Sequence, residues 1–161
     1  MKILIDTREQ QELIFDHPFI TEIIHTKLDL GDYACILEDG YKIDWVFERK
    51  NLGDLYGSLS KGYKRLKKRI NEAIANKIGF IIIIEASLTK VSKGYSHSTR
   101  SGNEIVQQLF TLYTKHNIPF HCCNTPEEAS LFITNFYLSI GKEHIKQLKL
   151  KSRETVPTLT K

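Results

Sequence analysis

The feature that most constrains the fold is a run of five apolar residues, Phe80–Ile84, which follows a long amphipathic segment. Its four isoleucines are stiff at χ1 and fit a pleated strand better than a helix. The run is too short for a stable helix and shows no polar alternation, so it predicts a central strand buried on both faces. A strand of this kind needs helices above and below its sheet, which indicates an α/β fold.

Segments earlier in the chain predict further strands. Lys2–Asp6 and Glu22–Thr26 are two candidates, and Tyr33–Leu37 and Lys42–Glu48 are two more. The last pair flanks Asp39-Gly40, a dipeptide suited to a tight hairpin turn because both residues tolerate positive φ. An antiparallel hairpin beside a central strand of the α/β type predicts a mixed sheet flanked by helices.

Three helices are expected, separated by one long loop. Asn51 would cap a helix that runs on past Ile70, because apolar residues recur there every three or four positions. A second helix spans Glu104–His116. The third begins at Thr125, where the sequence Thr-Pro-Glu-Glu supplies an N-cap, a proline at the first helical position and a capping-box glutamate. The polar segment Ser87–Ser101 predicts a loop.

Length and composition predict one intracellular domain. The 161 residues divide into a folded part, residues 1–145, and a basic, flexible tail, residues 146–161. The longest apolar run is far below the roughly 20 residues of a membrane span, and the N-terminus lacks the features of a signal peptide. Three cysteines make a disulfide framework improbable. We therefore expect no membrane partner and, in a cell without a nucleus, a cytoplasmic, nucleoid-associated location.

Charge is distributed unevenly along the chain. Residues 1–60 hold 12 acidic and 6 basic side chains, a net of −6, whereas residues 61–161 hold 7 acidic and 17 basic ones, a net of +10. One interpretation places a metal site in the first part and phosphate-binding groups in the second. The alternative is two solvated faces of opposite sign, and charge alone does not separate the two.

The triplet Glu48-Arg49-Lys50 ends a predicted buried strand and carries the clearest chemistry. Side chains alternate along a strand, so Glu48 and Lys50 should point to one face and Arg49 to the other. A carboxylate beside an ammonium suits phosphodiester hydrolysis, because the first can hold a divalent cation and the second can orient or deprotonate water. Magnesium needs more than one such ligand, and Asp32 is the obvious second one.

Asp54 falls four residues after Lys50, in the first turn of the expected helix. It could accept a hydrogen bond from Arg49 or Lys50, or bind a metal-bound water. Alternatively, it merely stabilises the helix N-terminus electrostatically.

A basic series follows the triplet and predicts a path for a phosphate backbone. On one continuous helix, three of its members would form a ridge with two more beside it, although a solvated helix face is the alternative. The ridge consists of Lys61, Arg65 and Arg69, with Lys64 and Lys68 beside it.

The spacing of these residues resembles a known family. Gly31-Asp32, fifteen intervening residues, Glu48-Arg49-Lys50 and three more residues to Asp54 match the GD…ERKxxxD pattern of XPF-type structure-specific nucleases. The opening segment Ile5–Glu9 is similar to the family's first-strand motif. The resemblance implies a restriction-endonuclease-like fold, a Mg²⁺ cofactor with Mn²⁺ as a substitute, and cleavage of branched or junction DNA in repair or recombination.

Carried over by residue, the resemblance makes Asp32 and Glu48 the metal ligands, with the Arg49 carbonyl as a further candidate. Lys50 would activate the water. Arg49 itself would bind an acidic partner or the phosphate, since its fork of donors suits both.

The resemblance also implies supporting roles for residues outside the triplet. Asp54 and Asp6 would be supporting acids in the catalytic site. Arg8 matches the pattern too and is a candidate DNA contact.

The chain departs from the family pattern in two ways. Family members commonly carry an arginine directly after the glycine of the following helix, but here Gly62 is followed by Tyr63, so either Arg65 or Arg69 could contact the phosphate. Larger relatives also carry helix-hairpin-helix or helicase domains, and we expect a stand-alone nuclease domain here.

The resemblance leaves the partner and the exact role open. It implies a homodimer through the C-terminal helices, where Phe132, Phe136 and Tyr137 would be core or interface. Holliday-junction resolution, or another phage-type or bacterial DNA-processing role, remains an alternative. A non-catalytic DNA-binding subunit is a further one, although family members of that kind lose the motif residues kept here.

Overall fold

The computed structural model describes residues 1–154, which form one six-stranded sheet in the order β2-β1-β3-β4-β5-β6. β1 pairs with β2 in parallel and with β3 antiparallel, β3 pairs antiparallel with β4, and β4, β5 and β6 are parallel. The expected mixed sheet is confirmed. The strands are β1 (Lys2–Asp6), β2 (Glu22–Thr26), β3 (Tyr33–Ile36), β4 (Trp45–Lys50), β5 (Gly79–Ile84) and β6 (Phe120–Cys122).

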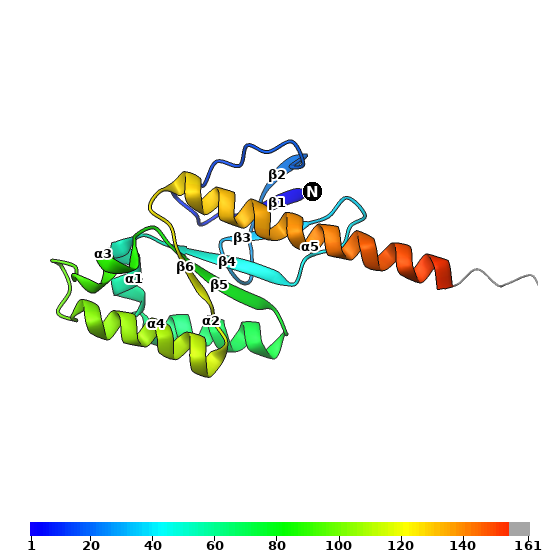
Figure 1. Cartoon of the computed structure of the whole chain (residues 1–161). Helices are drawn as coiled ribbons and strands as arrows, with labels where there is room; N and C mark the ends of the chain where they lie inside the picture. The colour runs from blue at the N-terminus through cyan, green and yellow to red at the C-terminus, as the bar shows by residue number, and fades with distance from the viewer. Residues whose placement is uncertain (155–161) are drawn as a thin grey trace, which may run out of the picture.

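Helices cover both faces of this sheet (Figure 1). The long α5 (Pro126–Glu154) lies along one face, and α1, α2, α3 and α4 lie on the other. β5 serves both layers, because Ile82 and Ile84 belong to the core under α1, α2 and α4 while Ile81 and Ile83 belong to the core under α5. The prediction of a central strand buried on both faces is therefore confirmed.

The prediction of one continuous helix from Asn51 past Ile70 is wrong. The segment forms two helices, α1 (Leu52–Ser58) and α2 (Tyr63–Ala75). Gly62 lies at the break, and its N–H donates to the Gly57 carbonyl at 2.9 Å. A Cβ at Gly62 would lie only 3.0 Å from that carbonyl oxygen. The close approach of the two segments turns the chain here, and it resets the direction in which α2 presents its side chains.

Two further segments differ from the expectation. The loop Ser87–Ser101 contains a short helix, α3 (Leu88–Ser92), whose N-cap Ser87 accepts a hydrogen bond from the Lys90 N–H. It then leads into α4 (Gly102–His116) through a capping box. The tail expected from residue 146 begins inside α5, which continues to Glu154. Residues 155–161 of that predicted tail lie outside the described residues.

None of the helices in residues 1–154 is long and apolar enough to cross a membrane.

Candidate active site at the end of strand β4

A tight turn before β3 places Asp32 at the end of β4. Gly31 adopts φ +72°, and a Cβ there would lie 2.7 Å from the Val46 Cβ, so both the backbone conformation and the available space require glycine. The Asp32 N–H donates to the Phe47 carbonyl at 2.7 Å, and its own carbonyl accepts from the Asp6 N–H at 2.9 Å. These bonds fix the aspartate between β1 and β4.

Glu48 and Lys50 point to the face of the sheet that α2 covers, as strand alternation predicts. Glu48 is fully buried, and its Oε1 accepts from the Lys50 ammonium at 2.7 Å and from the Arg69 guanidinium at 2.7 Å. Its second oxygen, Oε2, is buried and has no hydrogen-bond partner among the described residues. One oxygen of this carboxylate is thus held by two cations while the other remains available.

Asp32 belongs to the same electrostatic unit. Its Oδ2 accepts a hydrogen bond from the Arg49 backbone N–H at 2.8 Å, next to Glu48 in the chain. Burial, and then the charge of Glu48, raise the pKa of the Asp32 carboxyl well above its usual range. Two carboxylates that disfavour each other's charge are stabilised by a bound cation, so this pair suits a divalent metal ion.

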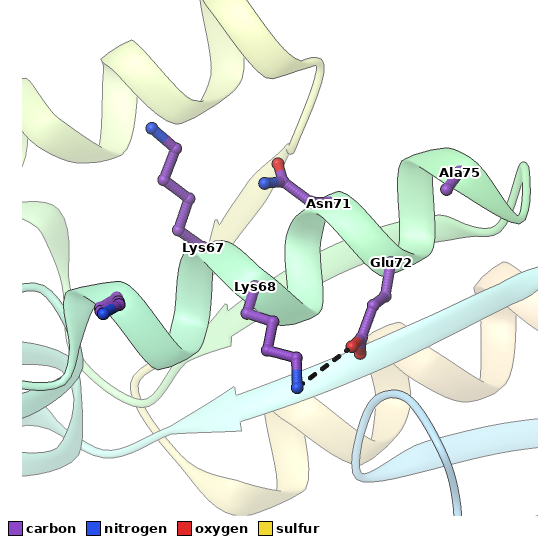
Figure 2. A pocket seen from close by; sticks show the side chains of 6 residues that line it. Lys67, Lys68, Asn71, Glu72 and Ala75 are labelled. Carbon is purple, nitrogen blue, oxygen red and sulfur yellow. Dashed lines mark ion pairs between the residues drawn. The ribbon is translucent and has the colours of Figure 1, made fainter.

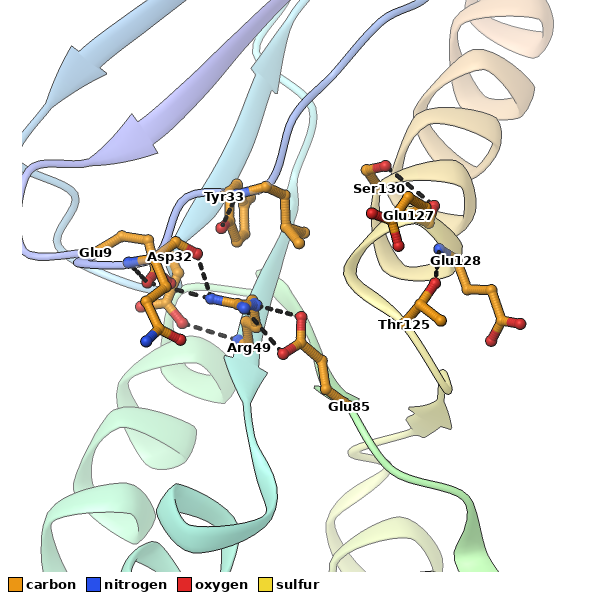
Figure 3. Close-up of polar contacts among 11 residues, drawn as sticks. Glu9, Asp32, Tyr33, Arg49, Glu85, Thr125, Glu127, Glu128 and Ser130 are labelled. Carbon is orange, nitrogen blue, oxygen red and sulfur yellow. Dashed lines mark hydrogen bonds and ion pairs between the residues drawn. The ribbon is translucent and has the colours of Figure 1, made fainter.

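Arg49 points to the opposite face of the sheet and is fully engaged there (Figure 3). Its Nε and Nη2 donate to the two oxygens of Glu85 at 2.6 and 2.8 Å. Its Nη1 contacts Glu9 at 3.4 Å and donates to the Gln11 carbonyl. Only 8% of the Arg49 side chain is exposed, so this arginine ties the loop after β1 to the ends of β4 and β5. Of the two partners that we considered, the structure shows the acidic one.

Asp54 does not make the expected hydrogen bond to Arg49 or Lys50. Arg49 lies on the other face of the sheet and Lys50 is held by Glu48, so neither donor is available. The exposed Asp54 carboxylate has no hydrogen-bond or ion-pair partner within residues 1–154, and its backbone N–H is capped by Asn51 at 2.9 Å. A role in binding a metal-bound water stays a prediction.

Asp6 is buried, and both of its oxygens are already bonded. Oδ1 accepts from the Arg8 N–H and Nε at 2.8 and 2.7 Å, and Oδ2 accepts from Arg8 Nη2 and the Leu28 N–H at 2.7 Å each. Hydrogen bonding to the Arg8 guanidinium is the main reason that the pKa of Asp6 falls to about 2. The geometry favours a role in bracing the loop after β1, while the Arg8 side chain stays 60% exposed and accessible to a ligand.

The expected basic ridge is only partly formed. Lys61 lies in the break before α2, so it does not continue the row of Arg65 and Arg69. Arg69 turns toward Glu48. Figure 2 shows another part of the series, where side chains along α2 border a shallow groove of about 440 Å³ and Lys68 reaches Glu72 at 3.8 Å. The groove is lined by Lys64, Lys67, Lys68, Asn71, Glu72 and Ala75.

Two contacts of the site were missed from the sequence. Glu85 is the main partner of Arg49, and its position directly after a buried strand was the available signal. The contact of Arg69 with Glu48 spans 21 residues and depends on how α2 is turned, for which the sequence offered no signal.

The donor set of the site is small. No group of three or more His, Cys, Asp or Glu side chains that could hold a metal ion occurs in the part of the chain that the structure describes. Asp32 and Glu48 give two carboxylates. Magnesium keeps several waters and is commonly held by one or two carboxylates, so these residues fit such a cation.

Comparisons with known proteins place the chain in a family. The ERCC4 domain matches residues 5–136. XPF from Aeropyrum pernix has a similar fold, with a TM-score of 0.64 at 19% identity over 99% of this chain and 76% of that one. The same protein in complex with DNA gives 0.60 at 21% identity, over 88% and 66%. Comparison with curated protein sequences found no significant match. The chain therefore belongs to the ERCC4 domain family and contains an XPF-type nuclease domain with the restriction-endonuclease-like fold.

Proposed function

We propose that this protein is a metal-dependent endonuclease that hydrolyses phosphodiester bonds in branched, flap, fork or junction DNA, in repair or recombination. The observation that carries the proposal is the buried Glu48 carboxylate, beside Asp32 and Lys50 at the end of β4, whose Oε2 has no partner in residues 1–154. Buried polar atoms are normally satisfied, and one that is not often marks a ligand position. The match to the ERCC4 domain supports a DNA nuclease.

Asp32 and Glu48 are the residues that would hold the metal, which we propose to be Mg²⁺, with Mn²⁺ as a substitute. A bound divalent cation would act as a Lewis acid on the charge that develops at the phosphate. The protein contributes fixed geometry, because Asp32 is held through its backbone and Glu48 by two cations. These contacts hold both carboxylates in place before the substrate arrives.

Lys50 is the residue that we propose to orient the attacking water and to move its proton. Its Nζ lies 2.7 Å from Glu48 Oε1, and 17% of the side chain is exposed, so the amine sits at the border between the buried carboxylate and solvent. We propose that Asp54 assists there, because its exposed carboxylate at the start of α1 has no partner among residues 1–154.

Cleavage assays with purified protein test the proposal. Labelled flap, fork, four-way junction and plain duplex DNA are incubated with Mg²⁺ or with a chelator. We expect Mg²⁺-dependent cleavage of at least one branched substrate and its loss in Asp32→Asn and Lys50→Ala. Asp29→Asn is the matched control, because Asp29 is exposed and lies three residues before Asp32. No cleavage of any substrate, or equal cleavage by all variants, contradicts the proposal.

We also propose a homodimer formed through the start of α5 and the edge strand β6. Tyr137 is buried in the core and is not an interface residue, whereas Leu131 is 61% exposed beside Phe132, which stacks on His121 at 3.9 Å. Light scattering should give twice the monomer mass for the wild type and the monomer mass for Leu131→Glu. A wild-type monomer at micromolar concentration contradicts the dimer.

A further inference from the structure

Arg69 is the one member of the basic series on α2 whose side chain reaches the buried carboxylate in the described structure. Its Nη1 donates to Glu48 Oε1 at 2.7 Å, and its Nη2 lies 3.4 Å from the Gly31 carbonyl at the turn that presents Asp32. The side chain is 26% exposed, so it is neither a free surface cation nor a fully buried one. It belongs to the site by contact, although it lies outside the motif that identified the site.

The contact has an electrostatic reason. A fully buried carboxylate is costly unless cations or hydrogen bonds compensate its charge. Lys50 and Arg69 share this task at Oε1, and no described residue bonds Oε2. In the protein without metal, Arg69 therefore supplies part of the positive charge that a divalent cation would supply. Arg69 and a bound divalent metal ion are expected to weaken each other's binding to Glu48, since like charges around one carboxylate repel.

The remaining donors of Arg69 point to its second function. A guanidinium carries five N–H donors in a planar fork that matches phosphate oxygens, and the contacts described use two of its nitrogens. Because a quarter of the side chain is exposed, a DNA phosphate at the site could draw the guanidinium away from Glu48. Such a shift would remove positive charge from the carboxylate at the moment when the metal is needed.

We propose that Arg69 is a positioning residue that couples DNA binding to metal binding: it holds Glu48 in the DNA-free protein and passes to a phosphate of the DNA when substrate binds. The inference rests on the proposed function, because it takes Glu48 as a metal ligand. By thermodynamic reciprocity, DNA that draws Arg69 to its phosphate raises the affinity for the metal ion, and the metal ion raises the affinity for DNA by the same factor. The protein then binds the cation weakly until DNA is present.

Metal binding to the DNA-free protein gives the first test. Mn²⁺ affinity is measured by electron paramagnetic resonance for the wild type, Arg69→Gln, Arg69→Lys and Lys67→Gln. Arg69→Gln should bind Mn²⁺ about fivefold more tightly than the wild type, because it removes an opposing charge. Arg69→Lys should remain within about twofold of the wild type. Lys67→Gln removes the same charge from an exposed position of the same helix and should leave Mn²⁺ affinity unchanged, because Lys50 and Arg69 are the cations paired with Glu48 in the described structure.

DNA binding without metal gives the second test. Four-way junction affinity is measured by fluorescence anisotropy in a chelator, where no cleavage occurs. Arg69→Gln should weaken binding about fivefold and Arg69→Lys much less, because the charge is kept and only the fork is lost. A merely structural role for Arg69 predicts a lower melting temperature and unchanged or weaker Mn²⁺ binding. That result overturns the inference, as does DNA binding that Arg69→Gln leaves unchanged.

Glu48→Gln separates this inference from the proposed function. The double variant Glu48→Gln/Arg69→Gln also covers the case in which Arg69→Gln alone folds poorly, because it leaves no buried carboxylate unpaired. If Glu48→Gln leaves Mn²⁺ affinity unchanged, the metal site itself is wrong and both proposals fail. If Glu48→Gln abolishes Mn²⁺ binding but Arg69→Gln does not raise it, only the inference about Arg69 fails. Arg69→Gln should have no effect on Mn²⁺ once Glu48 is neutral, and an effect that persists there also overturns it.

Discussion

The two faces of the sheet at the end of β4 carry similar charges that are arranged in opposite ways. On the Arg49 side, the guanidinium meets Glu85, Glu9 and the Gln11 carbonyl, and its donors are matched by acceptors. On the Glu48 side, one carboxylate oxygen has two cationic partners and the other has none within the described part of the chain. A matched cluster stabilises a fold, whereas a mismatched one leaves a position that a ligand can complete. Adjacent residues of one motif thus divide into a structural part and the part that we propose to bind a metal ion.

The sharpest test of this division is the loss of the Glu48 carboxylate. Glu48→Gln should lower the rate of DNA cleavage by about a thousandfold, the order seen when one catalytic electrostatic group is removed. The free energy of unfolding should change by less than about 1 kcal/mol. The reason is that Lys50 and Arg69 are 17% and 26% exposed and can be solvated by water. Single-turnover cleavage and urea unfolding measure the two effects. If Glu48→Gln lost as much stability as we expect for Arg49→Ala, the two faces of the sheet would not differ in the way described.

The Arg49 side should show the opposite pattern. Arg49→Ala leaves Glu85 partly buried without its partner, and we expect the free energy of unfolding to fall by about 3 kcal/mol. Arg49→Lys keeps the charge but loses the two-point contact with Glu85, so it should lose roughly half as much. Urea denaturation measures both. Arg65→Ala is the control, because Arg65 is exposed, and it should change stability by less than about 0.5 kcal/mol. If Arg49→Ala left the free energy of unfolding nearly unchanged, the matched cluster would not stabilise the fold.

A second matched contact, between Asp6 and Arg8, can be followed through pH. The pKa of Asp6 is lowered from 3.8 to about 2, so the ionised carboxylate stabilises the folded state above pH 4 and this contribution is lost as pH falls toward 2. Because Arg8 is 60% exposed, solvent screening leaves about 1 kcal/mol. The free energy of unfolding of the wild type should exceed that of Asp6→Asn by this amount at pH 5. The difference should shrink between pH 4 and pH 2. A difference that does not depend on pH contradicts this account.

The smallest expected effect concerns the surface of α2 beyond the Glu48 side. Lys64 and Lys67 border the groove in Figure 2 and are exposed. Neutralising both with glutamine should reduce the slope of log affinity against log salt by about 1 to 2, since each phosphate contact contributes about 0.9. Branched and plain duplex DNA should be affected alike. Removing the exposed lysines Lys27 and Lys142 should leave the slope unchanged. An equal fall in slope for both pairs of lysines would show that the DNA does not bind specifically along the groove on α2.

The local sequence pattern was enough to predict the direction and the burial of side chains in β4 and β5. The alternation of side chains placed Glu48 with Lys50 and Arg49 on the other face, and the structure shows this arrangement. The isoleucine run also predicted a strand buried on both faces. The first prediction depends on the two-residue period of a strand, and the second on a short apolar run without polar alternation. Both are properties of the local sequence.

The rest depended on contacts between segments distant in the chain. The break between α1 and α2 follows from the close approach of Gly62 to Gly57, and apolar periodicity does not record such an approach. Because the break turns α2, Arg69 meets Glu48 and Lys61 leaves the ridge. The short α3 contains too few residues to show a helical period. Side-chain pairing at the site was therefore visible only in three dimensions.

Gly31 has a consequence for anyone who would move this site to another protein. The residue has no reactive atom, yet its positive φ and its contact with Val46 decide where the neighbouring carboxylate stands. A designer who grafts Asp32, Glu48 and Lys50 onto two strands of a different scaffold would copy the proposed reactive groups and lose their spacing. The left-handed turn at Gly31 and the strand segment at Val46 that it packs against must be transferred together with these residues.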